Sequence, residues 1–539
     1  MKSIRLFIII IFIGLSNSVF AQIASRLEIP SDNLESFTIP CGNKGVLILS
    51  QLSKQEFNIR AFNTNLEQKW SKNGTIENSL DFVTHSFDGE QVSLLFSRFK
   101  SNSYLVFKIN VLTGKMEKFQ IYSVGRMEIS NFKVLNQSIF IGGIVDGQPL
   151  ILFTNLRAKQ TRILPSVVKG QAEIQSMDLD TTQQQVNVTY TVGNKAKNYQ
   201  LIIKSFDEDG NNMGQIVMNP SDEFAMMNAK LNQINDSLQI IVGTYGHKNT
   251  IGSSKGPSSQ GMYFNSFLDG EVIDSKFYSF TKFSNFFNFL SKKQKERQEK
   301  RIKDKEEKGE DLRLDYRLLM HEIIKNGDNY LVVAEAFYPD YKFSNYYPLY
   351  GGGMGAFSPY SSGFYSPWSY MYNPYRWGYG YYGLYSPFSN YYSPWGYRGY
   401  NYYGNQQQFD GWIYTHAVVA EFDKNGNLLW DHCIDLNDIK EGKLVQKIKT
   451  SVNKDQIILS YSKNNQIISK TITEKGEIEN EHIQDIETEN EGDKIKKSSK
   501  NELYFWYDNY FLASGYQNIS NEQEGRRSVY YLNKIQLKP

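Results

Sequence analysis

The chain has 539 residues, of which 59 are Lys or Arg and 57 are Asp or Glu, so its formal charge is +2. This balance argues against a dedicated nucleic-acid binder, which needs a concentrated basic surface to neutralise phosphates. Hydrophobic residues make up 40% of the sequence, enough to build a core. With two cysteines and six histidines, neither a disulfide framework nor a bound metal or cofactor is expected.

Residues 1–21 have the layout of a secretory signal peptide. Two basic residues precede the apolar run Leu6–Leu15, and the small residues Val19 and Ala21 occupy the positions expected just before a cleavage site. This run is too short to cross a hydrocarbon core of about 30 Å as a helix, so a membrane anchor is the weaker alternative. We therefore predict an exported protein that begins at Gln22 and is periplasmic, outer-membrane associated or extracellular.

Past residue 30, the dominant signal is a repeat of short apolar strands separated by polar turns. In each repeat unit, a first strand precedes the most apolar strand, and a third and fourth strand follow as a hairpin. The most apolar strands begin at Gly45, Gln91, Ser138, Gln184, Ser237, Tyr330, Gln456 and Glu502. Five of the seven spacings between them lie between 46 and 53 residues, and the two longer ones contain insertions.

Sequence similarity between the repeat units is clearest in the hairpin of the third and fourth strands. In several units an apolar residue stands four positions before a turn glycine, as in the segments Phe206–Gly210, Phe422–Gly426 and Ile472–Gly476. Gly426 is followed four residues later by Trp430, just as Leu66 is followed by Trp70. Glycine suits these turns because they require a positive φ, which strains other residues.

Four strands every 46 or so residues is the period of a β-propeller blade. We predict an all-β fold in which residues 22–539 form one β-propeller of eight four-stranded blades, with seven blades as the main variant. The segment Ile23–Ile29 is predicted to supply the missing strand of the last unit, which would close the ring and remove open edges. A β-sandwich or two smaller β domains also contain alternating strands, but they do not require a regular spacing.

The repeat hairpins resemble those of quinoprotein-type and WD40-type propeller families over residues 30–539. The likeness is one of repeat shape: Trp430 and Asp431 reproduce the WD dipeptide once, without the Gly-His partner in the same unit. No quinone-binding motif can be placed on the sequence, so the resemblance implies the fold and not the enzyme activity of those families. In an eight-bladed ring Cys41 and Cys433 would lie in blades that are not neighbours, so we expect two unpaired, buried thiols.

The first of two insertions is a charged segment within residues 285–312. Its part Ser291–Asp311 contains nine basic and seven acidic residues, with opposite charges at the i,i+4 spacing that supports a helix. Ile302 is the only apolar side chain there, so the helix has no apolar stripe to bury. We predict a solvated helical spur whose start is held on the ring by Phe286 and Phe287, with a charged docking arm as the alternative.

The second insertion, residues 343–410, is rich in Tyr, Gly and Pro and separates the second and third strands of the sixth unit. Between Tyr346 and Gly404, 59 positions hold 18 Tyr, three Trp, three Phe, 11 Gly and six Pro. Glycine and proline disfavour regular helix or sheet. The residues predicted to contact a partner are Tyr365, Trp368, Trp377, Tyr379, Tyr381, Tyr382, Tyr392 and Trp395.

Tyr and Trp combine a flat apolar face with a polar edge, which suits several kinds of contact. Protein interfaces favour these residues, and so does the boundary between a membrane and water. Stacking on sugar rings is a further use, and a loosely folded low-complexity loop is the structural alternative. An uncovered apolar segment in an exported protein would tend to self-associate, which favours a partner.

No local motif for catalysis or metal binding is found. The sequence has no H-x-x-x-H pair, C-x-x-C or Walker loop. Asp207–Asn211 and Asp423–Asn427 imitate the start of a calcium loop, but both lack the glutamate needed at the twelfth position, so we predict hairpin turns. Carboxylates that converge across blades at the central mouth would escape local motifs, which leaves a hydrolase site open.

Taken together, the sequence favours an exported interaction or scaffold protein without catalytic residues. It would bind an envelope protein partner through the aromatic insertion. A glycan-binding or glycan-hydrolysing propeller is the alternative, and peripheral contact with a membrane also stays open. We expect no nucleic-acid partner, no metal and no cofactor.

Overall fold

The structure is a computed structural model that describes most of residues 22–537. The parts it does not describe within this range are 32–34, 54, 78–79, 99, 166–170, 194–198, 222, 236, 248–257, 315, 344–406, 443, 454–455 and 491. The predicted signal peptide, residues 1–21, lies outside the described residues. Among those described, strands dominate, and α1 (Lys292–Glu306) is the one α-helix.

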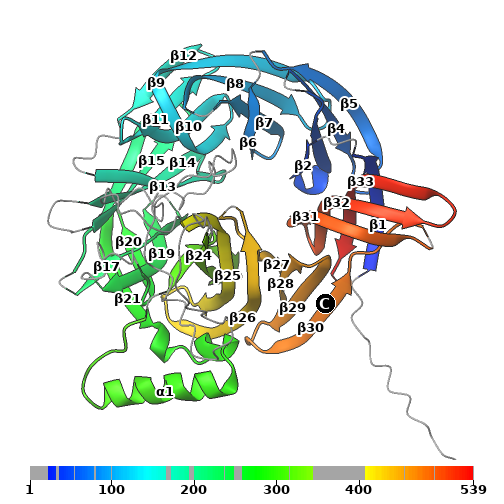
Figure 1. The fold of residues 1–539 in the computed structure, drawn as a ribbon. Coiled ribbons are helices and arrows are strands. Elements are labelled where there is room, and N and C mark those ends of the chain that lie inside the picture. The colour runs from blue at the N-terminus through cyan, green and yellow to red at the C-terminus, as the bar shows by residue number, and fades with distance from the viewer. Residues whose placement is uncertain are drawn as a thin grey trace, which may run out of the picture.

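The strands form antiparallel sheets that stand side by side in a ring around a central opening (Figure 1). In most of the sheets, successive strands of the chain are hydrogen-bonded neighbours, and the first strand lies nearest the ring axis. This arrangement is a β-propeller, so the fold predicted from the repeat is confirmed. It follows from the sequence because each apolar second strand has to be covered on both of its faces.

The first sheet contains β2 (Glu35–Pro40), β3 (Val46–Gln51), β4 (Glu56–Phe62) and β5 (Gln68–Thr75). The next sheet has seven strands, because the long strand β9 pairs with β8 through its first part and with β10 through its second. Its members are β6 (Asp81–Phe87), β7 (Gln91–Ser97), β8 (Ser101–Asn110), β9 (Met116–Leu135), β10 (Ser138–Val145), β11 (Gln148–Asn155) and β12 (Gln160–Leu164). Strand β9 therefore belongs to two successive repeat units.

Four further sheets follow along the chain. The first contains β13 (Gln171–Asp180), β14 (Gln185–Gly193), β15 (Tyr199–Asp207) and β16 (Asn212–Met218). The second contains β17 (Phe224–Met226), β18 (Lys230–Gln233), β19 (Leu238–His247), β20 (Gly261–Leu268) and β21 (Glu271–Ser279). The third contains β22 (Arg317–Met320), β23 (Ile324–Asn326), β24 (Asn329–Phe343), β25 (Gln407–Phe422) and β26 (Leu428–Glu441). The fourth contains β27 (Lys449–Asn453), β28 (Gln456–Lys463), β29 (Gln466–Thr473) and β30 (Ile478–Asp485).

The last sheet closes the ring with strands from both ends of the chain. Its order is β1 (Gln22–Pro30), β33 (Gly525–Gln536), β32 (Tyr510–Asn521) and β31 (Lys494–Tyr507), so β1 is the outermost strand. The prediction that the N-terminal segment completes the last unit is confirmed. One strand assignment is wrong: Glu502–Tyr507 lies in β31, the first strand of this sheet, and not in a second strand. The blade number stays a prediction.

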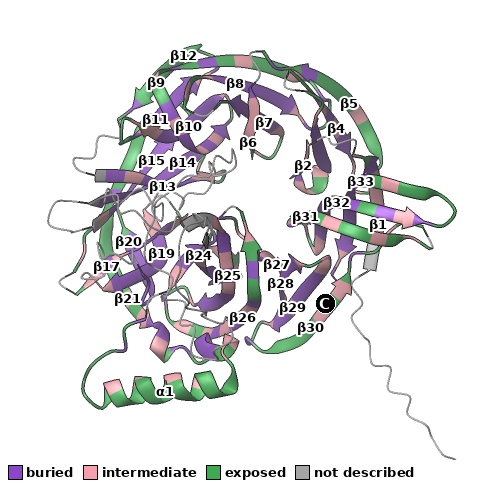
Figure 2. Cartoon of the chain, viewed as in Figure 1, coloured by how far each residue is buried: buried purple, intermediate pink, exposed green. Residues whose placement is uncertain are grey.

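The hydrophobic core lies between neighbouring sheets. One cluster, for example, joins Leu47 and Phe57 of the first sheet to Leu94 and Phe107 of the next. Outer strands such as β5 are largely exposed, as Figure 2 shows. Each sheet is therefore stabilised mainly by the sheet beside it, and the centre of the ring is left to polar residues.

The turn glycines form a recurring contact between neighbouring sheets. Gly426 and Gly476 have φ values of 75° and 77°, as the sequence pattern predicts. A Cβ added to Gly476 would lie 2.3 Å from Trp430 Cγ, and one added to Gly426 would lie 2.3 Å from Phe264 Cδ1. These glycines are required both by their backbone conformation and by an aromatic ring of the preceding sheet that packs against them.

The charged insertion forms α1 as predicted, and Figure 2 shows that helix exposed along most of its length. The apolar residues before it fix its start, because Phe286 is buried and Phe289 stacks on His416 with 3.7 Å between ring centres. The carboxylate of Asp431 accepts hydrogen bonds from the backbone amides of Ser284 at 2.8 Å and Asn285 at 2.7 Å. The aspartate of the isolated WD dipeptide thus holds this insertion on the ring.

Both cysteines are buried and free, so the expectation of two unpaired thiols is confirmed. Burial raises the pKa of each thiol to about 12, which keeps both in the unreactive protonated form at neutral pH. Among the described helices, none has the length and apolarity that a membrane-spanning helix needs.

Candidate functional site

The aromatic residues predicted to contact a partner lie in the segment 344–406, outside the described residues. This holds for Tyr365, Trp368, Trp377, Tyr379, Tyr381, Tyr382, Tyr392 and Trp395. Their role therefore stays a prediction. What the structure does describe is the hairpin that carries this segment and the part of the ring beside it.

The hairpin of β24 and β25 extends farther than the strands on either side of it. Its register runs out to Phe343 paired with Gln407. In contrast, β22 stops pairing with β24 at Phe337, and β26 stops pairing with β25 at Trp412. Residues 338–343 and 407–411 therefore form a two-stranded extension, here called the stalk, from which the aromatic segment leaves the sheet.

The base of the stalk is fixed by charge and by packing. The ammonium group of Lys440 forms ion pairs with the carboxylate of Asp340, at 2.6 Å, and with that of Asp410. The rings of Phe337 and Trp412 meet edge to face with 5.5 Å between their centres. Both rings belong to a core cluster shared with the neighbouring sheet of β27–β30. The stalk therefore has a defined direction relative to the ring.

Beside the stalk, the loop between β26 and β27 turns inward to the ring axis. The hydroxyl of Tyr414, at the stalk base, accepts a hydrogen bond from the amide of Val445 and donates one to its carbonyl, both at 2.7 Å. Val445 is one of four consecutive residues, 444–447, that line a cavity on the axis. The stalk and this cavity are therefore joined through one short loop.

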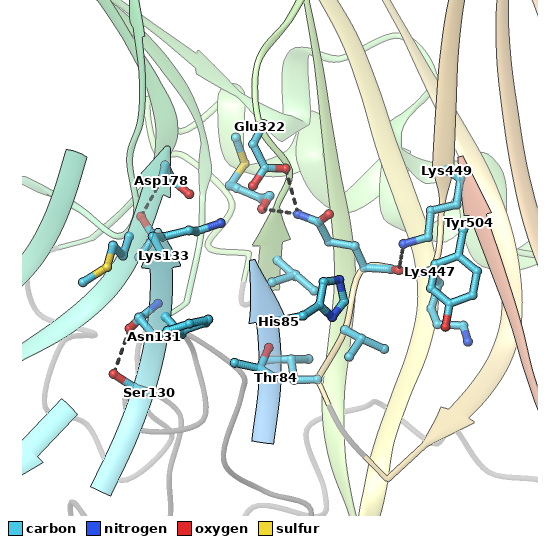
Figure 3. A pocket seen from close by; sticks show the side chains of 18 of the residues that line it. Thr84, His85, Ser130, Asn131, Lys133, Asp178, Glu322, Lys447, Lys449 and Tyr504 are labelled. Carbon is cyan, nitrogen blue, oxygen red and sulfur yellow. Dashed lines mark hydrogen bonds between the residues drawn. The ribbon is translucent and has the colours of Figure 1, made fainter. Parts of the chain in front are cut away.

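The axial cavity has a volume of about 460 Å³ and is lined by the first strands of most of the sheets (Figure 3). Its lining side chains carry a balanced set of charges, four of each sign. The basic residues are Lys133, Lys230, Lys447 and Lys449, and the acidic residues are Asp178, Glu322, Glu441 and Glu502. Most of them come from the inner edge of a sheet or from the connection beside it, while Glu441 ends the outer strand β26, so it is mainly ring closure that brings them together.

Lys230 lies at the centre of the tightest charge cluster. Its ammonium group lies 3.0 Å from Asp178 Oδ1 and 3.4 Å from Glu322 Oε1. Burial alone would lower the pKa of Lys230, but the two carboxylates offset that effect and hold its pKa above the usual value. In turn, Lys230 holds the pKa of Glu322 well below its usual range, against the opposing effect of burial. Lys230 and Glu322 are therefore both charged at neutral pH.

The four lysines differ in how they are neutralised. Lys447 forms an ion pair with Glu441, and Lys230 has the two carboxylates already described. Lys449 donates to the carbonyl of Gln446 at 2.7 Å but forms no ion pair with any described residue. The side chain of Lys133 forms no hydrogen bond or ion pair with the described part of the chain, although its charge helps to lower the pKa of Glu322. Two of the four amines in the cavity thus lack a direct carboxylate partner.

Two further groups shape the electrostatics of the cavity. Burial and the charge of Lys133 lower the pKa of His85 to about 4, so its imidazole is neutral at pH 7. The hydroxyl of Tyr504 donates to the carboxylate of Glu502, and burial raises the pKa of this tyrosine well above its usual value. Both side chains therefore act as uncharged hydrogen-bonding groups at the wall.

Carboxylates from different sheets do converge, a possibility that the sequence left open, since Asp178 and Glu322 meet at Lys230. Glycoside hydrolysis needs one carboxyl group with a raised pKa to donate a proton. The depressed pKa of Glu322 is the opposite of that requirement. Within the described residues, no group of three His, Cys, Asp or Glu side chains is placed to hold a metal ion. This arrangement suits binding better than acid catalysis.

The two calcium-like segments are hairpin turns, as predicted. Asp207 Oδ1 accepts hydrogen bonds from the amides of Asp209 at 2.9 Å and Asn211 at 2.8 Å. Asp423 Oδ1 accepts from Asn425 and Asn427 in the same way, both at 2.8 Å. These carboxylates are used within their own turns.

The axial residues were missed because none belongs to a local motif. A weak signal exists in the repeat itself: Lys133, Lys230 and Lys449 each stand in the first strand of a unit, five to eight positions before the second strand begins. A lysine that recurs at nearly the same place in three units marks a position that faces the axis. Its partners could not be found without the order of the sheets.

No family model and no curated protein matches the sequence. Among solved structures, the β-propeller domain of the Trilobed protease from Pyrococcus furiosus is 7% identical, with a TM-score of 0.34, over 85% of this chain and 96% of that one. An ACO/RPE65 chimera is 9% identical with a TM-score of 0.30, over 46% of this chain and 63% of that one. A Synechocystis apocarotenoid oxygenase mutant is 8% identical with a TM-score of 0.29, over 43% and 58%. The chain spans less than two thirds of these oxygenase structures, and likenesses at such TM-scores bear on no function.

Proposed function

We propose that the protein is an exported, non-catalytic scaffold that binds an envelope protein partner through its aromatic insertion. The observation that carries the proposal is the stalk: β24 and β25 continue to pair beyond both neighbouring strands, up to the first and last residues flanking the segment 344–406. A hairpin that only connected two blade strands would have no need for this extension. The stalk instead gives the two ends of that segment a fixed base.

The composition of the carried segment supports a protein partner. Interface cores are enriched in Tyr and Trp and depleted in charged residues. Between Tyr346 and Gly404, the segment has 21 such aromatic residues, 18 Tyr and three Trp, and only two charged ones, Arg376 and Arg398. Rigid rings give a large contact area at a small loss of conformational entropy. Fixing the base of the segment, through Lys440 and the core around Trp412, lowers that loss further.

The test is affinity capture from detergent-solubilised envelope with three forms of the mature protein. These are the intact chain, a form with Tyr346–Gly404 replaced by a short Gly-Ser linker, and a form with the eight predicted contact residues changed to Ser. Removal of α1 serves as the matched control, because it deletes another surface insertion in the connection that leads into the same sheet. We expect one partner, identified by mass spectrometry and reconstituted from purified components, to be lost from the first two variants and kept by the control.

Two outcomes would contradict the proposal. If the same partner is captured after replacement of the aromatic segment, the segment is not the contact element. If partners are unchanged while retention on a polysaccharide matrix is lost, the segment binds glycans, which is the alternative function. Circular dichroism of each variant shows whether the ring is intact.

A further inference from the structure

We propose that the axial cavity is a binding site for a small molecule that carries an oxyanion, a carboxylate or a phosphate group, held by Lys133 and Lys449. This site is distinct from the aromatic insertion and does not depend on its role. The inference rests on the cavity, on the two lysines without a direct carboxylate partner, and on the neutral hydrogen-bonding groups around them.

The cavity has the size and position of a ligand site. Its volume of about 460 Å³ falls within the range of roughly 300–1,000 Å³ that small-molecule pockets occupy. It lies on the axis of the ring, where side chains from many sheets converge. The walls include apolar residues such as Leu319 and Leu503 as well as polar groups. A few polar groups in a partly apolar cavity is the usual composition of a specific site.

The lysines of the cavity fall into two pairs with different roles. Lys230 and Lys447 are neutralised by Asp178, Glu322 and Glu441, and Lys230 joins its sheet to that of Asp178. Lys133 and Lys449 have no ion pair with a described residue. Burial lowers the pKa of Lys449, although the charges of Glu335, Glu502 and Glu322 partly offset that effect. An anion placed between the two amines would supply the direct counter-charge that they lack.

The two amines come from opposite walls. Lys133 lies on β9 and Lys449 on β27, and Figure 3 shows them on either side of His85. His85 is neutral at pH 7, so its ring can donate a hydrogen bond without adding charge. Thr84 and Asn131 also line the cavity on the side of Lys133. An oxyanion with neighbouring hydroxyl groups would find both charged and neutral partners there.

The carboxylates limit which anions fit. Glu322 remains ionised because Lys230 lowers its pKa, so its side of the cavity repels negative charge. Glu502 is engaged by the hydroxyl of Tyr504. A compact ligand with its anionic group at one end satisfies this pattern, whereas a polyanion such as a nucleic acid does not. The ligand class is therefore a small hydroxylated acid or sugar phosphate.

The experiment is calorimetric titration of the full mature chain with galacturonate, citrate, glucose 6-phosphate and inorganic phosphate. We expect one of these probes to bind with one-to-one stoichiometry and with an affinity that falls as salt increases. Lys133→Met and Lys449→Met, which keep an unbranched side chain but remove the amine, should each weaken binding by about tenfold or more. Lys72→Met, on the exposed outer strand β5, should leave it unchanged.

The proposal is overturned if no probe binds at millimolar concentration, or if the double variant Lys133→Met with Lys449→Met binds as tightly as the unchanged protein. Should a methionine variant fail to fold, as judged by circular dichroism, Lys133→Arg and Lys449→Arg replace it. These keep the charge and should retain binding of the same probe. Preference for the sugar phosphate over galacturonate, or the reverse, distinguishes phosphate from carboxylate as the bound group.

Discussion

Replacing Gly476 by Ala tests whether the turn glycines of the repeat connect neighbouring sheets. The added methyl group has two separate effects. Gly476 has a φ of 77°, and a non-glycine residue in this left-handed region costs about 1–2 kcal/mol. The new Cβ would also lie 2.3 Å from Trp430 Cγ, and forcing a methyl group into a packed contact costs about 1–3 kcal/mol more.

The two effects can be separated by a matched control. Gly525 has a φ of 83°, but a Cβ added there meets nothing within 4 Å. Gly525→Ala should therefore lose only the conformational part, about 1–2 kcal/mol, whereas Gly476→Ala should lose about 2–5 kcal/mol. The assay is equilibrium unfolding in urea, followed by tryptophan fluorescence, with the slope of the transition checked for each variant.

The double variant Trp430→Leu with Gly476→Ala completes the test. If the methyl group clashes with the indole ring, part of the loss should be recovered, with a coupling energy of about 0.5–3 kcal/mol. Equal losses in Gly476→Ala and Gly525→Ala, or strict additivity in the double variant, would refute the contact between sheets. The glycine would then be explained by its turn alone.

Three further predictions concern charged groups. Burial raises the pKa of Glu173 to about 7, so the folded state favours its protonated form, and stability is lost as the pH rises from about 4.5 to about 7. Glu173→Gln should therefore recover up to about 3 kcal/mol of stability above pH 7 and little below pH 4. The measurement is the melting temperature of both proteins as a function of pH. Arg527 lowers the pKa of Asp493 to about 2, so this ion pair stabilises the closing sheet above about pH 4 and is lost as the pH falls to about 2. Asp493→Asn should cost about 1 kcal/mol at neutral pH and nothing at the acid end, once solvent screening is allowed for. Lys440→Ala should speed amide hydrogen exchange in the stalk, residues 338–343 and 407–411. The free energy of unfolding of the ring should change by less than about 0.5 kcal/mol. Unchanged exchange would show that packing alone fixes the stalk.

Much of the fold could be predicted because its information is local and repeated. Seven of the eight predicted second strands, from Gly45 to Gln456, occupy the second position of their repeat units. The second strand is recognisable because its two faces are covered by neighbouring sheets and it is therefore apolar throughout. The turn glycines and the helix of the charged insertion were predictable for a similar reason, since backbone conformation and i,i+4 charges depend on nearby residues.

The eighth strand was misassigned because, in the sheet that closes the ring, the most apolar strand is not the second strand of its unit. Glu502–Tyr507 is apolar, but it is the innermost strand of its sheet. Trp506 in this strand is buried against the first sheet and donates a hydrogen bond from Nε1 to the carbonyl of Gly45 at 2.8 Å. The contact joins residues 461 positions apart. Apolarity there reflects the junction between the two ends of the chain.

The two candidate sites also differ in whether the sequence alone could reveal them. The aromatic insertion was found from composition, because 24 of the 59 residues between Tyr346 and Gly404 are Tyr, Trp or Phe. The axial cavity was not, because its charged residues are single positions in separate repeat units. Lys133 and Lys449, for example, stand in different sheets more than half the chain apart, and no window of sequence contains both.

By itself, the sequence determined the strand repeat, the turn conformations, the free thiols and the two insertions. The repeat, the turns and the insertions depend on residues close together in the chain, and the free thiols follow from the small number of cysteines and their wide separation. Only the tertiary structure decided which residues face the axis, which lysines are neutralised there, and how far the stalk extends beyond its neighbours. These features depend on contacts between sheets, which arise when the ring closes and bring together side chains that have no relation in sequence.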